Sequence, residues 1–259
     1  MLRFLTFLAA AVAGLGAPAA MAGLITLAEP SIVVGPEKPD MAIIAATLPG
    51  GHAFDQVPGQ RTGNGPLAPA LAAAFTARNC TVATLFDRVS DTVRKATQER
   101  QIPWLAASGA TDMPCAAGGN GRSVAMVVAN AAYRSQGVSP LVNSVADGRL
   151  VGSALKAAGY DVVEVYDADR SVLESSFRAF TERARGAVSA VFYYSGYGVG
   201  IGGAGPLPSL SLLAVDQNAG VIESSFSVNT LLRGFAESAP ARTIVILDTD
   251  FSTIQAVSR

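Results

Sequence analysis

The sequence predicts an α/β protein in which a mainly parallel central sheet lies between two layers of helices. Three observations lead to this prediction. Short apolar segments alternate with amphipathic ones along the chain, as successive strands and helices do. The segment 188–192, apart from a single serine, and the segment 244–247 are apolar, which is typical of strands buried on both faces. Val82, Leu85 and Val89 follow helical spacing, so they form one apolar stripe that faces the sheet.

The expected elements of the first part of the chain follow in order. Residues 41–47 form a buried strand, and helices over 66–78 and 81–96 come after it. A short, weak edge strand is expected at 106–113. The small residues of 116–121 then form a flexible joint.

The same alternation continues after the joint. The expected strands are 123–130, 161–167, 188–194 and 243–247, with a further extended segment at 212–215. The expected helices are 144–158, 171–184 and 227–237. Asp169 or Ser171 caps the second of these helices, because short polar side chains accept hydrogen bonds from the first free N–H groups.

Composition excludes several kinds of ligand. The chain of 259 residues carries 19 basic and 20 acidic side chains, so it offers no basic face for nucleic acid. One histidine and two cysteines are too few for a zinc site of the usual spacing. We expect neither a metal nor a cofactor. The length fits one large α/β domain.

Residues 1–22 have the features of a secretory signal peptide. Arg3 precedes an apolar run at 4–15, and small residues at 20–22 form a cleavage site before Gly23. The apolar run is shorter than the roughly 20 residues of a membrane span. We therefore expect an exported protein, periplasmic or secreted, that has no membrane contact after cleavage. The alternative is an uncleaved signal anchor.

Cys80 and Cys115 are the two cysteines of the chain. An oxidising compartment permits them to form a disulfide. The alternative is a pair of buried, inert thiols. The distance between the residues decides between the two, and the sequence does not give it.

Two strand ends carry the signature of a family. Residues 193–198 are Tyr-Tyr-Ser-Gly-Tyr-Gly, and residues 244–250 are Ile-Val-Ile-Leu-Asp-Thr-Asp. They resemble the strand ends of caspase-like cysteine peptidases (the metacaspase and caspase superfamily), which read Tyr-Tyr-Ser/Ala-Gly-His-Gly and Ile-Leu-Asp-Ala-Cys. Tyr197 then stands at the position of the catalytic histidine, and Asp250 at that of the cysteine. The resemblance implies a caspase-like fold without the catalytic dyad.

The two replacements do not supply the chemistry of that dyad. A cysteine peptidase needs a thiolate nucleophile and an imidazole that exchanges a proton near neutral pH. A phenol, with a pKa of about 10, is ionised to about one part in a thousand at pH 7. A carboxylate is a feeble nucleophile toward an amide. We therefore predict that Tyr197 and Asp250 do not support proteolysis.

Further segments resemble the same family, but in a changed order. Those at 128–133, 141–147, 159–162 and 213–216 are similar to its IGN-Y, L-N--NDA, GF-V and L-PVD signatures. Those at 43–50, 63–71, 86–89 and 100–104 are similar to the small-subunit half of bacterial members, which in the family follows the cysteine strand. The small-subunit-like half comes first here.

This order indicates a circular permutant of a caspase-like three-layer sandwich. Its expected parts are a small-subunit-like half at 23–115, a linker at 116–122 and a large-subunit-like half at 123–259. The segment 112–123 spans about 35 Å when extended, whereas four strand spacings require about 19 Å. The linker is therefore long enough. The alternative is a swapped dimer in which the halves of two chains pair.

The resemblance also implies a substrate cleft. Asp248 stands two residues before the cysteine position, where metacaspase-like relatives place an acid that lines the pocket for a basic side chain. Ser195, Gly196 and Asp248 are therefore candidate substrate-binding residues. The alternatives are that Asp248 and Asp250 cap the turn after the strand or hold a cation, although two carboxylates fall short of a calcium cage.

Two loops border this expected cleft. His52 lies in the loop 49–65, which borders the cleft in the family, and it is the remaining candidate substrate-binding residue. The alternative is that His52 is an exposed loop residue, because no acid lies next to it in the sequence. The glycine-rich segment 200–203 is expected to form a mobile cleft loop, because its spacing fails the dinucleotide-binding fingerprint.

Taken together, the sequence predicts an exported caspase-like pseudopeptidase that binds a peptide or protein segment in the remnant cleft. The first alternative is an active caspase-family cysteine-type endopeptidase, or another hydrolase, with an unrecognised nucleophile. The second is a structural module that forms a homodimer or pairs with a caspase-like relative.

Overall fold

The computed structural model describes most of the chain from residue 40 onward. The described ranges are 40–47, 51–59, 63–109, 111–118, 121–134, 138–202, 209–216, 225–249 and 251–255. The predicted signal peptide at 1–22 and the predicted dyad residue Asp250 lie outside these ranges. The linker 116–122 and the expected loop 200–203 are described in part.

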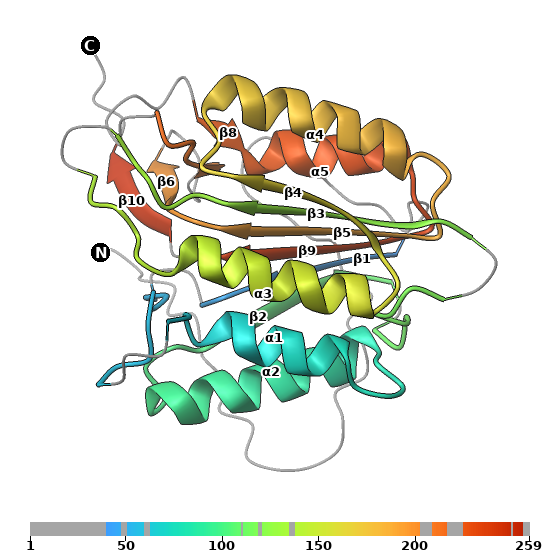
Figure 1. Ribbon diagram of the computed structural model, residues 1–259, viewed down its shortest axis with the longest axis horizontal. Helices are drawn as coiled ribbons and strands as arrows, with labels where there is room; N and C mark the ends of the chain where they lie inside the picture. The colour runs from blue at the N-terminus through green and yellow to red at the C-terminus, as the bar shows by residue number, and fades with distance from the viewer. Residues whose placement is uncertain are drawn as a thin grey trace, which may run out of the picture.

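A six-stranded sheet forms the centre of the described structure, with the strand order β2-β1-β9-β5-β3-β4 (Figure 1). Its strands are β1 (Asp40–Ala45), β2 (Trp104–Ser108), β3 (Ser123–Ala129), β4 (Asp161–Tyr166), β5 (Ser189–Ser195) and β9 (Arg242–Asp248). β2 is antiparallel to β1, and the other neighbours are parallel. The sheet thus joins strands from both ends of the chain, because β1 pairs with β9.

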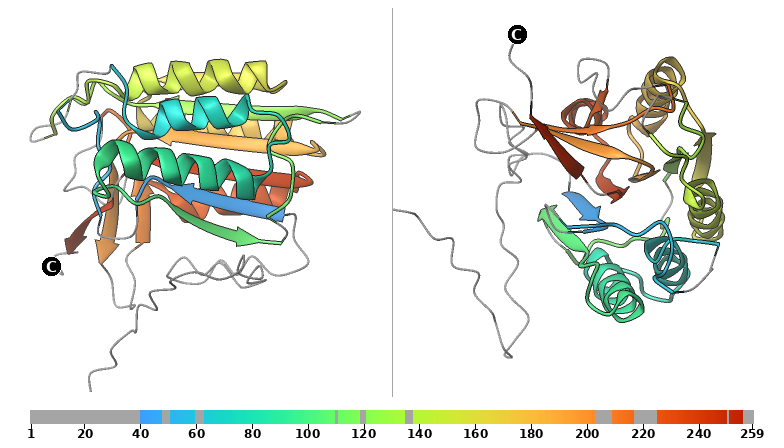
Figure 2. Two further views of the ribbon diagram at one scale, coloured as in Figure 1. Left: turned by 90° about the horizontal axis from the view of Figure 1, so that it is seen from below. Right: turned by 90° about the vertical axis from the view of Figure 1, so that its left-hand side faces the viewer.

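Within the described ranges, five helices cover the two faces of this sheet. They are α1 (Leu67–Phe75), α2 (Val82–Thr97), α3 (Ser144–Ala157), α4 (Arg170–Ala184) and α5 (Val228–Ser238). Figure 2 shows α1, α2 and α3 over one face, and Figure 1 shows α4 and α5 together over the other. This arrangement confirms the predicted α/β class with a mainly parallel sheet between two helix layers.

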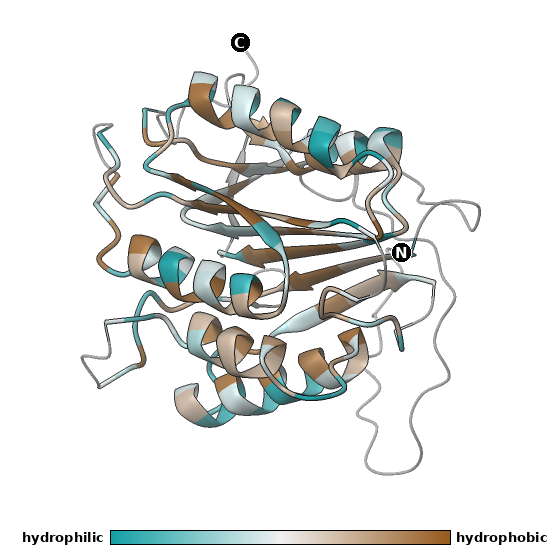
Figure 3. Ribbon diagram, turned by 45° about the vertical axis from the view of Figure 1, so that its right-hand side comes forward, coloured by the Kyte–Doolittle hydropathy of each residue, from teal (hydrophilic) through white to brown (hydrophobic). Residues whose placement is uncertain are grey.

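The alternating side chains of each strand supply two hydrophobic cores. Tyr193 of β5 packs with α1, α2 and α3, whereas Phe192 and Tyr194 pack against α4 and α5. Because consecutive side chains of a strand point to opposite faces, a continuously apolar strand serves both cores. Figure 3 shows these hydrophobic strands between the helix layers.

Local signals explain where the helices begin. Thr81 and Thr84 form a capping box at the start of α2, in which each side chain binds the backbone N–H of the other residue. Asp169 caps α4 by accepting a hydrogen bond from the N–H of Val172 at 2.8 Å. Of the two caps considered for this helix, the structure therefore selects Asp169.

A second, four-stranded sheet with the order β10-β6-β7-β8 lies beyond the carboxyl ends of the parallel strands (Figure 1). Its strands are β6 (Gly198–Gly202), β7 (Ser209–Leu212), β8 (Phe226–Ser227) and β10 (Phe251–Gln255). The expectation of a mobile loop at 200–203 is therefore wrong for its described residues. Backbone pairing with β7 and β10 orders this glycine-rich segment as a strand.

Two other expected strands were misplaced. The edge strand expected at 106–113 is β2, which begins at Trp104 and ends at Ser108, because it pairs with residues Met41–Ala45 of β1. The segment 111–114 forms a turn and a single bridge to Thr81 instead. Residues 213–215 of the expected extended segment lie beyond the end of β7.

Cys80 and Cys115 form a disulfide with a Cα–Cα distance of 5.4 Å. Both side chains are buried, and the N–H of Cys115 donates to the carbonyl oxygen of Cys80 at 3.0 Å. The bond joins the start of α2 to the segment that leads into the linker. Of the two possibilities that the sequence left open, the structure thus contains the disulfide.

None of the described helices is both long enough and apolar enough to span a membrane.

Candidate functional site

A small pocket opens where the parallel strands β5 and β9 end. Its volume is about 90 Å³, and Ser195 and Asp248, which lie opposite each other on the two strands, both line it. The full lining is Ala53, Phe54, Asp55, Leu141, Ser144, Asp147, Ser195, Gly196, Tyr197, Asp248 and Thr249. The carboxyl ends of parallel strands are where open α/β sheets bind their ligands.

Three aspartates from separate parts of the chain line this pocket. Asp55 comes from the loop before α1, Asp147 from the first turn of α3, and Asp248 from the end of β9. Parts of the chain before and after the linker therefore both contribute to the pocket.

Asp55 holds the entrance of α3. Its carboxylate accepts hydrogen bonds from the backbone N–H groups of Val142 at 2.9 Å and Asn143 at 3.2 Å. The side-chain amide of Asn143 donates in return to the backbone oxygen of Asp55 at 2.6 Å. Negative charge at this end of a helix is also favoured by the helix dipole.

Asp147 is buried and is held by the segment before α1. Its Oδ1 accepts hydrogen bonds from Nδ2 of Asn64 at 2.8 Å and from the N–H of Gly65 at 3.0 Å. Its Oδ2 lies 3.1 Å from the same Gly65 nitrogen. A Cβ atom at position 65 would fall 3.0 Å from Asp147 Oδ2, so glycine permits this close approach.

Asp248 binds the tyrosine on the neighbouring strand. The hydroxyl of Tyr193, which is buried under α3, donates to Oδ2 of Asp248 at 2.8 Å. Burial is the main reason that the pKa of Tyr193 lies well above its ordinary value, so this hydroxyl keeps its proton and remains a donor.

Burial also changes the protonation of the carboxyl groups. It raises the pKa of Asp147 to about 7, although the hydrogen bonds from Asn64 and Gly65 lower it in part. Burial, followed by the charge of Asp147, raises the pKa of Asp248 to about 8. Two acids of this pocket therefore titrate near neutral pH, and a bound cation would favour their charged forms.

Two buried serines complete the polar wall of the pocket. The hydroxyls of Ser144 and Ser195 form a hydrogen bond of 2.7 Å, which links the start of α3 to the end of β5. Neither histidine nor cysteine is present among the residues that line the pocket. The lining of the pocket thus offers no imidazole to activate either hydroxyl.

Tyr197 is held at the rim by two other tyrosines. Its N–H donates to the hydroxyl of Tyr133 at 2.7 Å, and the hydroxyl of Tyr194 donates to its carbonyl oxygen at 2.8 Å. The rings of Tyr133 and Tyr197 are 4.9 Å apart between centroids. A Cβ atom at Gly196 would lie 2.6 Å from both hydroxyl oxygens, so this arrangement requires glycine there.

The predicted site residues are placed as follows. Ser195, Gly196, Tyr197 and Asp248 line the same pocket. His52 is exposed and is not part of the lining, so its predicted role in binding stays a prediction. Asp250, the other predicted dyad residue, lies outside the described residues, and its distance from Tyr197 stays open.

Sequence reasoning missed three residues of the site: Asp55, Ser144 and Asp147. Ser144 and Asp147 belong to the segment 141–147, which was used as a family signature but not as a source of ligands. This family signature could have indicated Asp147 as a site residue. Asp55 lies far from it in the chain, and no pattern in the sequence connects the two.

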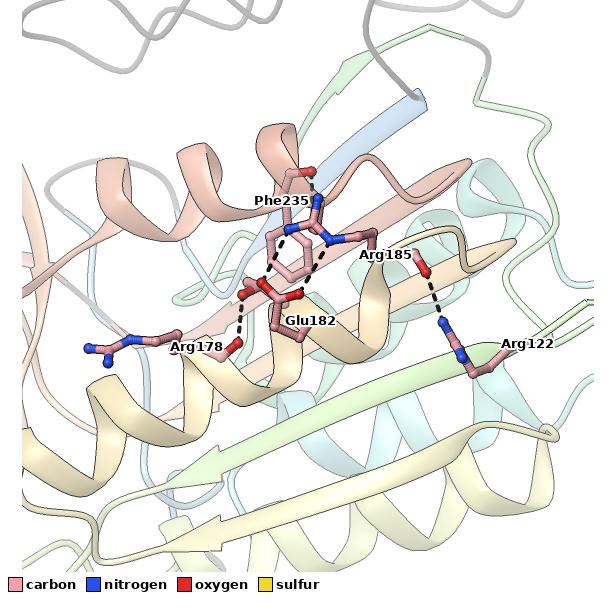
Figure 4. A network of polar contacts seen from close by, with 7 residues as sticks. Arg122, Arg178, Glu182, Arg185 and Phe235 are labelled. Carbon is pink, nitrogen blue, oxygen red and sulfur yellow. Dashed lines mark hydrogen bonds and ion pairs between the residues drawn. The ribbon is translucent and has the colours of Figure 1, made fainter.

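A separate polar network lies at the opposite end of the sheet (Figure 4). Arg122 donates to the carbonyl oxygen of Arg185 at 2.8 Å, and Arg185 pairs with Glu182. These side chains are largely exposed, so we assign them no role in the site. Within the described residues, no group of three or more His, Cys, Asp or Glu side chains is arranged to hold a metal ion.

A family model described as the caspase domain matches residues 26–113 and 122–253, which together make up most of the chain. The matched ranges include the three pocket aspartates and both predicted dyad positions. No curated protein matches the chain.

Proposed function

The chain belongs to the caspase-domain family, and from this premise we propose that it is a pseudopeptidase that binds a peptide or protein segment without cleaving it. The pocket at the ends of β5 and β9 holds a basic side chain of the ligand. The observation that carries the proposal is the convergence of Asp55, Asp147 and Asp248 on that pocket.

Electrostatic complementarity supports a basic ligand. Three acids line the pocket, and none of the described residues that line it is basic. Like charges held in a half-buried site are unfavourable, which is one reason why the pKa of Asp248 is raised. A cation from the ligand relieves this repulsion, so the pocket favours Lys or Arg over any acidic or apolar residue.

The state of the chain's nucleophiles supports binding without cleavage. By the resemblance of the two strand ends, Tyr197 occupies the position of the family's histidine, and Asp250 that of its cysteine. Both cysteines of the chain are joined in the disulfide, so neither offers a thiolate. The alternative of an active cysteine-type endopeptidase would require that this bond be reduced.

Export and chain order are parts of the same proposal. Disulfides form and persist in oxidising compartments. The Cys80–Cys115 bond therefore supports a periplasmic or secreted protein, as does the signal-like segment 1–22. The reach of the segment 112–123, which contains the linker 116–122, supports an intramolecular circular permutant over a swapped dimer, because about 35 Å of extended chain exceeds the roughly 19 Å that four strand spacings require. The permutant predicts a monomer in sedimentation equilibrium, whereas an obligate dimer would favour the swap.

A cleavage assay tests the proposed function. The purified protein is incubated with peptides that carry a basic, an acidic or an apolar residue before the test bond, and the products are followed by mass spectrometry. We expect no turnover of any peptide. Turnover that disappears in Asp250→Ala or Tyr197→Phe would refute the loss of catalysis. Labelling of a serine or cysteine by an electrophilic probe would favour the hydrolase alternative.

A pull-down distinguishes the peptide-binding proposal from the remaining alternative, a structural module. A structural module that pairs with an active relative predicts that the protein recovers another caspase-domain chain from its own cell extract. The peptide-binding proposal predicts instead that a peptide with a single basic residue competes with whatever the protein recovers. Recovery that this peptide does not affect would favour the structural role.

A further inference from the structure

Asp147 and Asp248 of the pocket are held by neutral donors. Asp147 is 2% exposed, and its carboxyl group accepts hydrogen bonds from the side-chain amide of Asn64 and the backbone N–H of Gly65. The carboxyl group of Asp248 accepts the hydroxyl of Tyr193. Neutral donors orient a buried carboxylate, but they do not balance its charge. Among the described residues, neither aspartate therefore has a cation as its partner.

The titratable groups that face this pair are an acid and two phenols. Asp55 comes from the loop before α1, Tyr193 from β5, and Tyr197 from the segment after β5. A phenol is neutral at neutral pH, so the tyrosines add no charge. Burial is the main reason that the pKa of Asp147 is raised, and the negative charge of Asp55 adds to it. A proton on either member of the pair removes part of this repulsion.

The basic side chains of the neighbouring elements lie elsewhere. Arg149 of α3 lies over the ring of Tyr166, 5.7 Å from its centroid, and Arg100 lies over the ring of Phe54 at 5.6 Å. Neither arginine lines the pocket, and the exposed His52 does not line it either. The described part of the protein thus offers the pair no counter-charge, so the pair loses its negative charge by holding a proton or accepts a cation from outside.

The protonation of the pair agrees with this arrangement. Burial raises the pKa of Asp147 to about 7 and that of Asp248 to about 8, so the two groups together hold at least about one proton at pH 7. A cation that enters the pocket stabilises the ionised carboxylates and lowers both pKa values. The entry of a positive charge and the loss of a proton are therefore linked.

We propose that the pocket exchanges protons for its ligand: as a basic side chain enters, the carboxyl O–H bonds of Asp147 and Asp248 break, the protons pass to the solvent, and the two carboxylates pair with the cation. The pocket therefore binds its ligand in neutral and alkaline solution and releases it in acid. This inference rests on the proposed function, because it names the regulation of the same pocket.

Calorimetry in two buffers tests the exchange on the purified protein. The ligand is a peptide with an acetylated amino terminus, an amidated carboxyl terminus and a single lysine (the acetylated Lys peptide), and its Arg and norleucine counterparts are measured beside it. Released protons are taken up by the buffer, so the difference in heat between phosphate and Tris gives their number. We expect the release of about one proton for each basic peptide bound at pH 7.

The affinity for a basic peptide should follow the same linkage. Each proton released makes binding about tenfold tighter per pH unit over the interval in which the pair titrates. We expect the acetylated Lys peptide to bind at least about tenfold more tightly at pH 8.5 than at pH 6. Lysine and arginine stay charged over this interval, so the change belongs to the protein.

Asparagine variants assign the released protons to the pair. Asp248→Asn and Asp147→Asn keep the shape of the side chain but cannot titrate, so each should release fewer protons than the unaltered protein at pH 7. Asp87→Asn, on the exposed surface of α2, is the matched control and should retain the release. His52→Gln should also retain it, because His52 lies outside the lining.

The outcomes separate this inference from the proposed function. A heat that does not depend on the buffer, or an affinity that stays constant from pH 6 to 8.5, would overturn the proton exchange while a basic-residue pocket still stood. These measurements on the unaltered protein decide the exchange even where a variant fails to fold.

The variants and the norleucine peptide complete the separation. Release that Asp248→Asn and Asp147→Asn both retain in full, or that His52→Gln or Asp250→Asn alone abolishes, would overturn the assignment to the pair. Equal binding of the norleucine peptide, or binding of no peptide, would remove the proposed function and this inference with it.

Discussion

Asp55 and Asn143 bind each other twice. The N–H of Asn143 donates to the Asp55 carboxylate at 3.2 Å, and its side-chain amide donates to the Asp55 backbone oxygen at 2.6 Å. One residue precedes α1, and the other precedes α3. The contact therefore joins the parts of the chain on either side of the linker at the place where the acidic pocket lies.

Asp55→Ala should therefore lower the stability of the protein and also disturb the arrangement of the pocket. Loss of the carboxylate leaves the N–H groups of Val142 and Asn143 without this acceptor, and we expect a fall of about 1–3 kcal/mol in the free energy of unfolding. Urea unfolding measures the change. Asp91→Ala, on the exposed face of α2, is the control and should have little effect. Equal stability of both variants would contradict the role of Asp55.

Stability should decrease as pH rises from about 4 to above 8 on account of Asp147 and Asp248. Both have folded-state pKa values raised above the ordinary value, to about 7 and about 8, so the folded protein binds more protons than the unfolded chain in this interval. The contribution of these groups is fully present below the unfolded pKa and is lost as pH rises through the folded one.

Asp248→Asn isolates this effect. Its free energy of unfolding should depend less steeply on pH between 5 and 8 than that of the unaltered protein, by up to about 1.4 kcal/mol per pH unit. Denaturant unfolding at a series of pH values gives the slopes. Parallel curves for the two proteins would show that Asp248 does not titrate as the buried pocket predicts.

Removal of the disulfide should cost stability without altering the pocket. Cys80→Ala with Cys115→Ala is expected to lower the free energy of unfolding by about 2–4 kcal/mol, because the unfolded chain regains the freedom that the cross-link removes. A reducing agent should bring the unaltered protein toward the variant. A variant as stable as the oxidised protein would show that the bond contributes nothing.

Gly196→Ala tests the packing at the pocket rim. The added methyl would lie 2.6 Å from the hydroxyl oxygens of Tyr133 and Tyr194, so we expect a loss of about 1–3 kcal/mol and a displaced Tyr197. Thermal unfolding provides the measure. Gly118→Ala is the matched control, because its new methyl would meet its nearest neighbour at 3.9 Å. A loss no larger than that of the control would refute the tight fit.

The sequence predicted the central sheet and its helices well, because their apolar periodicities are strong. The strands β3, β5 and β9 are apolar on both faces, and the stripe of α2 is regular. The second sheet was not predicted, because its strand β6 alternates glycine with Val199 and Ile201. Such a glycine-rich composition is typical of loops. The extended form of β6 depends on pairing with β7 and β10, which local sequence does not encode.

The site was predictable only where it coincides with strand ends. Ser195, Gly196 and Asp248 end or follow buried strands, so the topology of a parallel sheet brings them together. Asp55 enters the pocket through its hydrogen bonds to α3, which are tertiary contacts. Neither the composition nor the residue spacing of the sequence indicates such a contact. The convergence of the three aspartates could therefore be recognised only in the structure.

The most direct test of the central claim is the binding of a basic peptide to the purified protein and to Asp248→Asn, with the recovered peptide examined by mass spectrometry. Asp87→Asn, on the exposed surface of α2, is the control. We predict that the unaltered protein and the control bind the acetylated Lys peptide and leave it intact, whereas Asp248→Asn binds it at least about tenfold more weakly. Equal affinity in all three proteins, or a cleaved peptide, would contradict the account.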